Sequence, residues 1–316
     1  MPSNRKNGDV QKLSVPLDLA LVAAARAIGS RLCPGDASSK YFVHNRFLYP
    51  IVYFFDFFGF PLRQLVTARS FLVYEKLWQT LQDSHPPEIV IHLSGGYSSH
   101  LLNLSMEDLQ QHDKISREYI LTDLSTTLSF HQTVNSRFFK DYKQKSPFIL
   151  FLEYDVFRDN LVQLLEKHHV DFKNKKVLVF FEGFYYYLPP ETRTELLKQI
   201  VEILKPQQGF LITDFQSKDF CVLLQERKLR GWRKMRNALA TLIARKLTSS
   251  SSTYPLEKDG FEINFFFYGF QVVESTPTSD SKRIAPLSLI SNLEIQAFPL
   301  LAFNVYLFQY HSPYPK

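Results

Sequence analysis

The sequence predicts an α/β protein with a doubly wound, mostly parallel sheet of seven strands. Short runs of apolar, branched and aromatic residues alternate with amphipathic stretches along the central part of the chain. This alternation repeats about every thirty residues, which is the length of one strand–helix–strand unit. The central runs lack the in–out alternation of a half-exposed strand, as is typical of strands buried on both faces of a parallel sheet.

Helical patterns separate the central strands. The pattern Ser125–Asp141 opens with a serine that can cap a helix, Asp159–His168 carries leucines on one face, and Pro190–Lys205 has proline in its first turn. Each follows one of the apolar runs, so the order of elements favours parallel strands joined by crossover helices. The predicted strands are Glu88–Leu93, Tyr119–Asp123, Phe148–Tyr154, Val177–Phe181 and Gly209–Asp214.

Further elements flank this centre on both sides. Helical patterns at Leu17–Leu32 and Leu62–Leu81 precede the first strand, and Lys218–Lys246 is predicted to be a helical cap after the fifth. The runs Phe270–Glu274 and Phe303–Tyr310 supply the last two strands. We expect these two to pair as a hairpin at the edge of the sheet.

One domain accounts for the length of the chain. With 316 residues, 45% of them hydrophobic, the chain can bury one large core. We expect a poorly ordered tail over residues 1–15 and a single domain over residues 16–316. Its predicted parts are a helical or lid region at 16–83, a ligand-binding core at 84–217, a helical cap at 218–260 and the C-terminal strands at 261–316.

The composition excludes several classes of protein. Cys33 and Cys221 are the only cysteines and show no metal-ligand spacing, so neither a disulfide framework nor a metal site is expected. The N-terminal segment lacks the apolar core of a signal peptide, and no apolar run reaches the roughly 20 residues of a membrane span. We therefore expect a cytoplasmic protein without integral membrane association. A net charge of +6 is too diffuse to predict nucleic-acid binding, although it suits an anionic small molecule.

The ends of the first two strands carry residues that indicate a ligand site. In an open parallel sheet, ligands bind beyond the carboxyl ends of the strands. The first strand runs into Ser94, Gly95 and Gly96, where small residues let the backbone approach a ligand, although a tight turn also explains them. The second strand ends at Asp123, whose carboxylate can accept both hydroxyls of a ribose or cap the next helix.

The next two strands also end near acids. The third leads into Asp155 and Val156, and the acid can receive the amino group of an adenine. The fourth ends in Glu182 and Gly183, which are followed by three tyrosines at positions 185–187. Because an unpaired glutamate is seldom buried, Glu182 indicates either a ligand or a structural ion pair.

These residues resemble the leucine carboxyl methyltransferase family of S-adenosylmethionine-dependent methyltransferases, which also contains bacterial small-molecule O-methyltransferases. The resemblance runs from about Leu17 to Pro206 and is most specific at Glu182–Pro190. There the family pattern is an acid, a glycine, three apolar residues and Tyr-Leu-Pro. Ala24–Ile28 resembles the N-terminal motif of the family, and Ala68–Phe71 resembles the motif whose arginine holds the methionine carboxylate of the cofactor.

The resemblance implies a class I, Rossmann-like methyltransferase fold, with S-adenosylmethionine as cofactor and S-adenosylhomocysteine as product. Carried over by position, Arg69 pairs with the methionine carboxylate and Asp123 takes the ribose hydroxyls. Asp155 meets the adenine, and Glu182 lines the methionine amino end. The implied cofactor-binding set also contains Ser94, Gly95, Gly96, Val156 and Gly183.

The chain departs from the family at the turn after the first strand. The family pattern Leu-Gly-(Ala/Cys)-Gly-Leu-Asp-(Thr/Ser)-Arg is matched by the residues from Leu93 to His100. The first glycine is replaced by Ser94, and the acid and the arginine are replaced by Ser98 and His100. We expect Ser94 to fit the turn with a negative φ. Loss of the acid–arginine pair indicates an outlying, bacterial-type member.

Methyl transfer from a sulfonium is an in-line displacement, and orientation of the reacting atoms can supply roughly 7–11 kcal/mol. An ionised carboxylate needs no base, whereas a hydroxyl acceptor needs one. His100 beside the turn is the preferred base; His92 is expected to be a hydrogen-bonded core residue, and His131 lies on the next helix. We expect Tyr185, Tyr186 and Tyr187 to wall the transfer centre or to hydrogen-bond the acceptor, unless one or two of them only fill the core; Tyr186 and Tyr187 are the preferred pair.

The expected function is methylation of a carboxyl or hydroxyl oxygen on an apolar small molecule. Tyr41–Phe60 predicts an aromatic lid, and the basic helix Glu226–Lys246 either forms a solvated face or attracts an anionic acceptor. The alternatives are a protein C-terminal carboxyl methyltransferase and a cofactor-binding protein without transferase activity. A NAD(P)-dependent oxidoreductase is disfavoured because no G-x-G-x-x-G follows the first strand.

Overall fold

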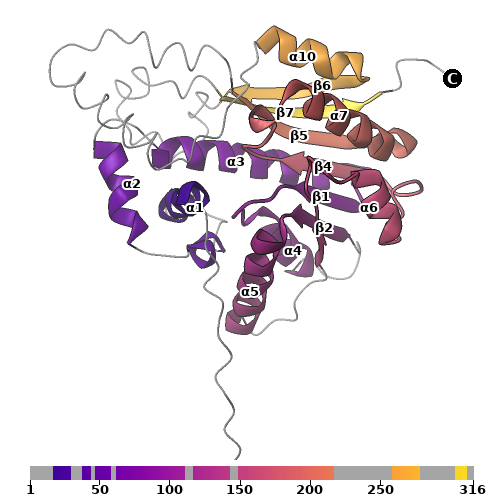
Figure 1. The fold of residues 1–316 in the computed structure, drawn as a ribbon. Helices are drawn as coiled ribbons and strands as arrows, with labels where there is room; N and C mark the ends of the chain where they lie inside the picture. Colours follow the sequence, from indigo (N-terminus) through magenta and orange to yellow (C-terminus); the bar gives the residue numbers. More distant parts are fainter. Residues whose placement is uncertain are drawn as a thin grey trace, which may run out of the picture.

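A single sheet runs through the part of the chain that the computed structural model describes (Figure 1). The described residues are 17–29, 38–43, 47–57, 62–110, 117–142, 149–216, 258–277 and 303–311. Within them, seven strands lie in the order β3-β2-β1-β4-β5-β7-β6. The strands are β1 (Ile89–Leu93), β2 (Glu118–Asp123), β3 (Ile149–Glu153), β4 (Val177–Phe181), β5 (Phe210–Gln216), β6 (Phe270–Pro277) and β7 (Phe303–Tyr310).

The first five strands are parallel, and the last two pair antiparallel at one edge. β1 lies between β2 and β4, while β3 and β5 extend the sheet on either side. β7 is inserted between β5 and β6. This arrangement confirms the predicted doubly wound, mostly parallel sheet and the edge pairing of the last two strands. Because the direction of winding reverses between β1 and β4, their carboxyl ends flank the crevice where such sheets bind ligands.

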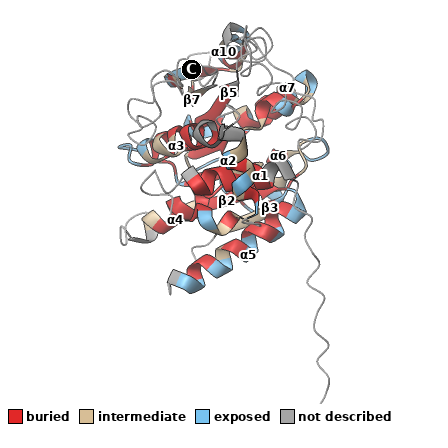
Figure 2. Ribbon diagram, turned by 90° about the vertical axis from the view of Figure 1, so that its left-hand side faces the viewer, coloured by how far each residue is buried: buried red, intermediate tan, exposed pale blue. Residues whose placement is uncertain are grey.

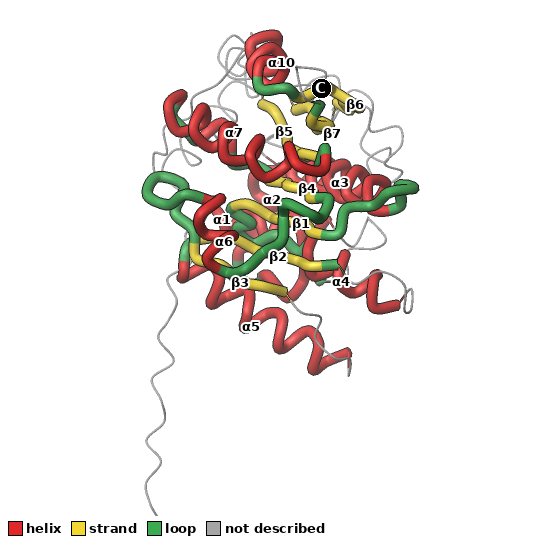
Figure 3. Tube along the Cα trace, turned by 90° about the vertical axis from the view of Figure 1, so that its right-hand side faces the viewer, coloured by secondary structure: helices red, strands yellow, loops and turns green. Residues whose placement is uncertain are grey.

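Helices cover both faces of the sheet because alternate strand residues face opposite sides. Ile89 and Ile91 of β1 pack into a core with α6, α7 and α10, whereas Val90 packs into a second core with α3 and α4. Figure 3 shows α6 and α7 on one side of the strands and α3 and α4 on the other. The helices that flank the sheet are α3 (Leu62–Leu81), α4 (His100–Gln110), α5 (Ser125–Tyr142), α6 (Leu161–Lys167), α7 (Pro190–Leu204) and α10 (Lys258–Phe267).

The N-terminal helix α1 (Leu17–Gly29) packs against α3 through small side chains. Ala24 and Ala25 are fully buried, and side chains of this size let two helix backbones approach closely. Figure 2 shows most of the described α1 residues as buried. This packing fixes where the one arginine of α1 points. The other N-terminal elements are η1 (Ser39–Phe42) and α2 (Leu48–Phe57).

Several expectations concern residues outside the described ranges. They are the tail at 1–15, the cap at Lys218–Lys246 with its basic segment Glu226–Lys246, the two cysteines Cys33 and Cys221, and parts of the aromatic segment Tyr41–Phe60. Among the residues that are described, His, Cys, Asp and Glu side chains form no group placed to hold a metal ion. None of the described helices combines the length and the apolar character needed to cross a membrane.

Candidate functional site

The turn after β1 is held in an unusual backbone conformation. Ser94 has φ 48° and Gly96 has φ 52°, so both lie in the left-handed region. The expectation of a negative φ at Ser94 is therefore wrong. The backbone turns sharply here although position 94 carries a side chain. Position 95 has room only for glycine. A Cβ there would overlap Leu121 Cδ1 and would lie 3.0 Å from His92 Nδ1.

Asp123 at the end of β2 reaches back to this turn. Its Oδ2 accepts a hydrogen bond from the Gly96 N–H at 2.8 Å, and its Oδ1 accepts one from the Leu124 N–H at 2.7 Å. The residue is 9% exposed, and burial raises the pKa of its carboxyl above the ordinary value. The Thr127 side chain donates to the same carboxylate. Because two carboxylate oxygens offer about four acceptor positions, Asp123 can still accept a bond from a ligand.

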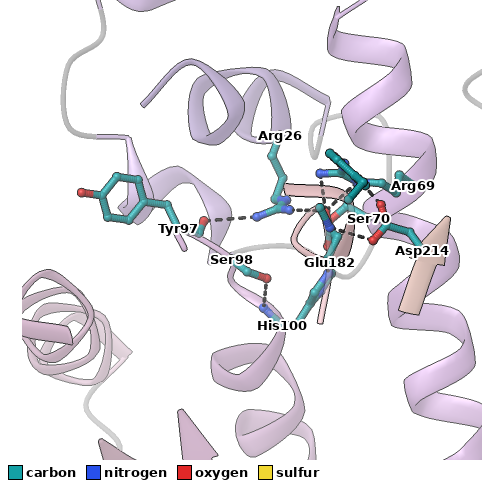
Figure 4. Close-up of polar contacts among 10 residues, drawn as sticks. Arg26, Arg69, Ser70, Tyr97, Ser98, His100, Glu182 and Asp214 are labelled. Atoms are coloured by element: carbon teal, nitrogen blue, oxygen red, sulfur yellow. Dashed lines mark hydrogen bonds and ion pairs between the residues drawn. The ribbon is translucent and has the colours of Figure 1, made fainter. Parts of the chain in front are cut away.

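Five ionisable side chains at the carboxyl ends of β1, β4 and β5 form what we call the charge cluster (Figure 4). At its centre, Glu182 Oε1 lies 2.6 Å from Arg26 Nη2 and 3.1 Å from Arg69 Nη2. Burial alone would raise the pKa of Glu182, but the two guanidinium groups outweigh it and hold that pKa well below its usual range. The members of the cluster are Arg26, Arg69, His100, Glu182 and Asp214.

Arg69 of α3 joins the two acids of the charge cluster. Its Nη1 lies 3.5 Å from Asp214 Oδ2 and donates to the Tyr186 hydroxyl at 3.3 Å. Asp214 Oδ1 in turn accepts from the Gly183 N–H at 2.7 Å. Gly183 has φ 67°, and a Cβ there would lie 3.1 Å from Arg69 Nη1, so the position requires glycine. Burial raises the pKa of Asp214, although Arg69 opposes that shift.

His100, the expected base, lies inside the charge cluster. Its Nε2 is 2.9 Å from Glu182 Oε2 and 3.2 Å from Ser70 Oγ, and the residue is 3% exposed. A serine–histidine–acid relay needs its two partners on different ring nitrogens. Here both partners meet the same nitrogen, so the arrangement is not a nucleophilic triad. The position suits a residue that holds Glu182, and proton transfer by His100 remains a prediction.

The other two histidines near the turn are also buried. His92 stacks on Phe180 with ring centroids 4.0 Å apart, and its Nδ1 has no hydrogen-bond partner among the described residues. The expectation of a hydrogen-bonded histidine is therefore not met at that nitrogen. His131 of α5 behaves differently, because its Nε2 lies 2.6 Å from the Gly96 carbonyl oxygen.

The three tyrosines after Gly183 form the short helix η2 (Tyr185–Tyr187) and differ in exposure. Tyr185 is buried in the core, where its hydroxyl accepts from Asn264 Nδ2 at 3.3 Å. Tyr186 is also buried, while Tyr187 is 40% exposed and its ring centroid lies 4.6 Å from that of Tyr186. Of the three tyrosines expected at the transfer centre, Tyr185 packs in the core, Tyr186 touches the charge cluster and Tyr187 faces solvent.

A hollow of about 730 Å³ opens beside Asp123, at the ends of β2 and β3. Asp155 lines it, but its carboxylate is engaged by the Phe157 N–H at 3.0 Å and by Arg158 Nε at 3.4 Å. Val156 lies next to it, half-buried against the core. The structure thus brings Arg69, Glu182 and the turn together, while Asp155 lies on the neighbouring hollow. The lining residues are Leu124, Ser125, Thr126, Glu153, Asp155, Arg158, Asp159, Asn160, Gln163, Leu164 and Lys167.

Sequence reasoning missed two members of the charge cluster. Asp214 lies two residues before the end of β5 and ends the strand that the sequence predicts at Gly209–Asp214, so the rule that points to Asp123 and Glu182 applies to it equally well. Arg26 was noticed only within an N-terminal motif and was given no role. Its signal was a single arginine in an alanine-rich apolar helix, where a buried cation needs an anionic partner.

Comparisons with known proteins yield structural likeness only. No family model matches the chain, and no curated protein matches it. A Thermobifida fusca protein described as a candidate methyltransferase is 12% identical, with a TM-score of 0.56 over 97% of this chain and 100% of that one. A DUF574-family protein from Streptomyces avermitilis is 13% identical, with a TM-score of 0.54 over 91% of this chain and 97% of that one.

Other matching structures belong to longer proteins. The chain spans about half the length of two of them, 47% of a pericyclic reaction enzyme and 54% of the PKMT2 protein of Rickettsia typhi. At such low identity the likeness is one of fold alone. The fold of this chain is the Rossmann-like class I methyltransferase fold that its sequence predicts.

Proposed function

We propose that the protein is an S-adenosylmethionine-dependent O-methyltransferase related to the leucine carboxyl methyltransferase family. Its acceptor is a carboxyl or hydroxyl group of an apolar small molecule. The observation that carries the proposal is the placement of Asp123, the Gly96 turn and the Arg69–Glu182 pair around the crevice between β1 and β4. Cofactors bind at this crevice in doubly wound sheets.

The adenosine end of the cofactor fits the region around Asp123. The buried Asp123 carboxylate has acceptor capacity left, so a hydroxyl donor would stabilise it. The ribose of the cofactor carries two such hydroxyl groups. The hollow of about 730 Å³ beside it falls within the range of small-molecule sites, which is about 300–1,000 Å³. We therefore assign the ribose to Asp123 and the adenine to the hollow that Asp155 lines.

The methionine end fits the charge cluster. Arg26 and Arg69 present two guanidinium groups around Glu182, and the fork of a guanidinium suits the two oxygens of a carboxylate. Glu182 is held ionised, so it can accept from an ammonium group. Sequence reasoning assigned only Arg69 to the carboxylate, and we now add Arg26 because it contacts the same oxygen of Glu182.

When bound, the cofactor supplies a methyl group on a positively charged sulfur. The protein has to hold that group and orient the acceptor oxygen toward it, because alignment provides most of the rate. Tyr187 is the exposed aromatic residue beside the charge cluster, so we place the apolar acceptor against it. A carboxylate acceptor needs no base here, whereas a hydroxyl acceptor needs His100 to leave its contact with Glu182.

Binding titrations test the cofactor site. Asp123→Asn and Glu182→Gln should each weaken the binding of S-adenosylmethionine and S-adenosylhomocysteine by at least about tenfold, roughly 1.4 kcal/mol. Both changes remove a negative charge and keep the shape of the side chain. Asp171→Asn and Glu202→Gln alter exposed acids elsewhere and should leave the affinity unchanged. A wild-type chain that binds neither compound, with a native circular dichroism spectrum, would refute the proposal.

Labelled cofactor distinguishes the two acceptor groups. The chain is incubated with methyl-labelled S-adenosylmethionine and a panel of apolar carboxylic acids, phenols and alcohols. A methyl ester releases labelled methanol in mild base, while a methyl ether keeps its label. Transfer to a peptide C-terminus instead would support the protein carboxyl methyltransferase alternative.

A cofactor-binding protein without transferase activity is the second candidate. The burial of His100 within the charge cluster favours it, because no histidine among the described residues near the turn is exposed to an acceptor. Tight binding of S-adenosylmethionine without transfer of label to any acceptor class would support this second candidate over the first.

A further inference from the structure

His131 is a buried residue of α5 that neither the expected site nor the charge cluster uses. Its Nε2 lies 2.6 Å from the carbonyl oxygen of Gly96, and its ring meets Phe42 edge-on with centroids 5.0 Å apart. Since a carbonyl oxygen only accepts, the imidazole must be the donor. The Nε2 atom therefore carries the proton of this contact.

Gly96 is consequently held on both sides. Its N–H donates to Asp123 Oδ2 at 2.8 Å, and its carbonyl accepts from His131. The next carbonyl, that of Tyr97, accepts from Arg26 Nη1 at 3.2 Å. Three successive peptide groups of the turn are thus each oriented by one side chain, and those side chains come from β2, α5 and α1.

This restraint matters because the turn is intrinsically permissive. Glycine populates many backbone conformations, so the peptide groups around Gly96 do not orient themselves. If the whole Gly96 residue changed conformation, its N–H would turn away from the Asp123 carboxylate and that contact would be lost. A fixed donor at the carbonyl keeps the Gly96 N–H in place, and with it the hydrogen bond that holds the Asp123 carboxylate at the turn.

We propose that His131 is a positioning residue, which donates from Nε2 to the Gly96 carbonyl and thereby holds the turn and Asp123 in the conformation that receives the cofactor's ribose. This inference rests on the proposed function, because it assigns His131 a part in the same site. Arg26 and His92 are the charged or titratable groups that act on the His131 ring. Burial lowers the pKa of His131, the hydrogen bond to the Gly96 carbonyl raises it, and Arg26 lowers it, with a net shift to about 4.

A pair of substitutions separates hydrogen bonding from packing. His131→Gln places an amide N–H where Nε2 stands, whereas His131→Met has a similar length and no donor. We expect the Gln variant to keep S-adenosylhomocysteine affinity within about threefold of wild type and the Met variant to lose at least about tenfold, roughly 1.4 kcal/mol. Gln132→Met, on an exposed position of the same helix, is the matched control and should leave the affinity unchanged.

The possible results have distinct meanings. If the wild type binds no S-adenosylhomocysteine, the proposed function fails before His131 is tested. If the wild type binds and the Met variant binds as tightly as the Gln variant, His131 only fills space and the positioning role is overturned.

A measurement on the wild type covers the case in which the Met variant does not fold. Nitrogen NMR of the chain with labelled histidine reports which ring nitrogen carries the proton at neutral pH. A neutral His131 protonated at Nε2 supports the inference, and protonation at Nδ1 alone overturns it.

Discussion

At the scale of the residue, Ser94 stores strain in the turn. An L-residue in the left-handed region costs roughly 1–2 kcal/mol, because its Cβ approaches the following carbonyl oxygen. Glycine avoids this cost, but it also raises the conformational entropy of the unfolded chain, which offsets part of the stabilisation. We therefore expect Ser94→Gly to raise the free energy of unfolding by about 0.5–1 kcal/mol, measured by urea denaturation.

Gly96→Ala is the opposite change at φ 52° and should lower the free energy of unfolding by about 1 kcal/mol. If Ser94→Gly were less stable than the wild type, the serine hydroxyl would have to make a contact that outweighs the strain.

Single residues also show how far sequence reasoning reaches. Strand ends can be located from apolar runs, and the structure has Asp123 as the last residue of β2 and Glu182 directly after β4, while their roles in a site stay a prediction. The sign of φ at Ser94 could not be predicted, because it depends on how the turn closes against β2 through the Gly95 N–H and the Thr122 carbonyl. The pairing of His100 with Glu182 joins residues far apart in sequence and depends on packing that no local pattern records.

At the scale of the element, α1 and α3 each deliver one guanidinium to the crevice. Breaking a buried ion pair by removing one partner costs about 3–5 kcal/mol, because the other charge remains buried. Arg69 forms ion pairs with both Glu182 and Asp214, whereas Arg26 pairs with Glu182 alone among the acids of the charge cluster. We expect Arg69→Met to destabilise the protein more than Arg26→Met, with both free energies measured in urea.

The physical reason for that order is the number of acids left behind. After Arg26→Met, Glu182 keeps Arg69 and His100. After Arg69→Met, the buried Asp214 loses the cation that lies nearest to it, and its protonation would then set the remaining cost. Equal losses, or a larger loss for Arg26→Met, would show that the two arginines do not divide the acids in this way.

The bounds of an element can be predicted well where a run of apolar residues defines them. They are predicted less well where hydrogen bonding to a neighbouring strand defines them. The strands at 177–181 and 303–310 have the predicted bounds, and most of the others differ by a residue or two. β6 was expected to end at Glu274 but continues to Pro277. Its polar end pairs with β7, as Ser275 does with Tyr306, and a bulge at Val272/Glu274 shifts the register. An apolar pattern cannot show pairing of this kind.

At the scale of the whole molecule, the buried histidines make stability depend on pH. Burial lowers the pKa of His131 from its ordinary value near 6.5 to about 4, and the pKa of His92 is lowered for the same reason. Between these values the unfolded chain binds a proton at His131 that the folded chain does not bind. The contribution of neutral His131 to the free energy of unfolding is therefore fully present above about pH 6.5 and is lost as the pH falls toward about 4.

The loss from His131 can reach about 3 kcal/mol, since each pKa unit corresponds to about 1.4 kcal/mol. Glu182 acts in the same direction but at lower pH, because its folded pKa lies below its ordinary value of 4.5. Substituting His131 by Gln should thus flatten the fall in the free energy of unfolding between about pH 6.5 and pH 5, where Glu182 stays ionised in both states. Urea denaturation across this range tests it, and an unchanged slope in the Gln variant would mean that His131 titrates in the folded chain as it does in the unfolded one.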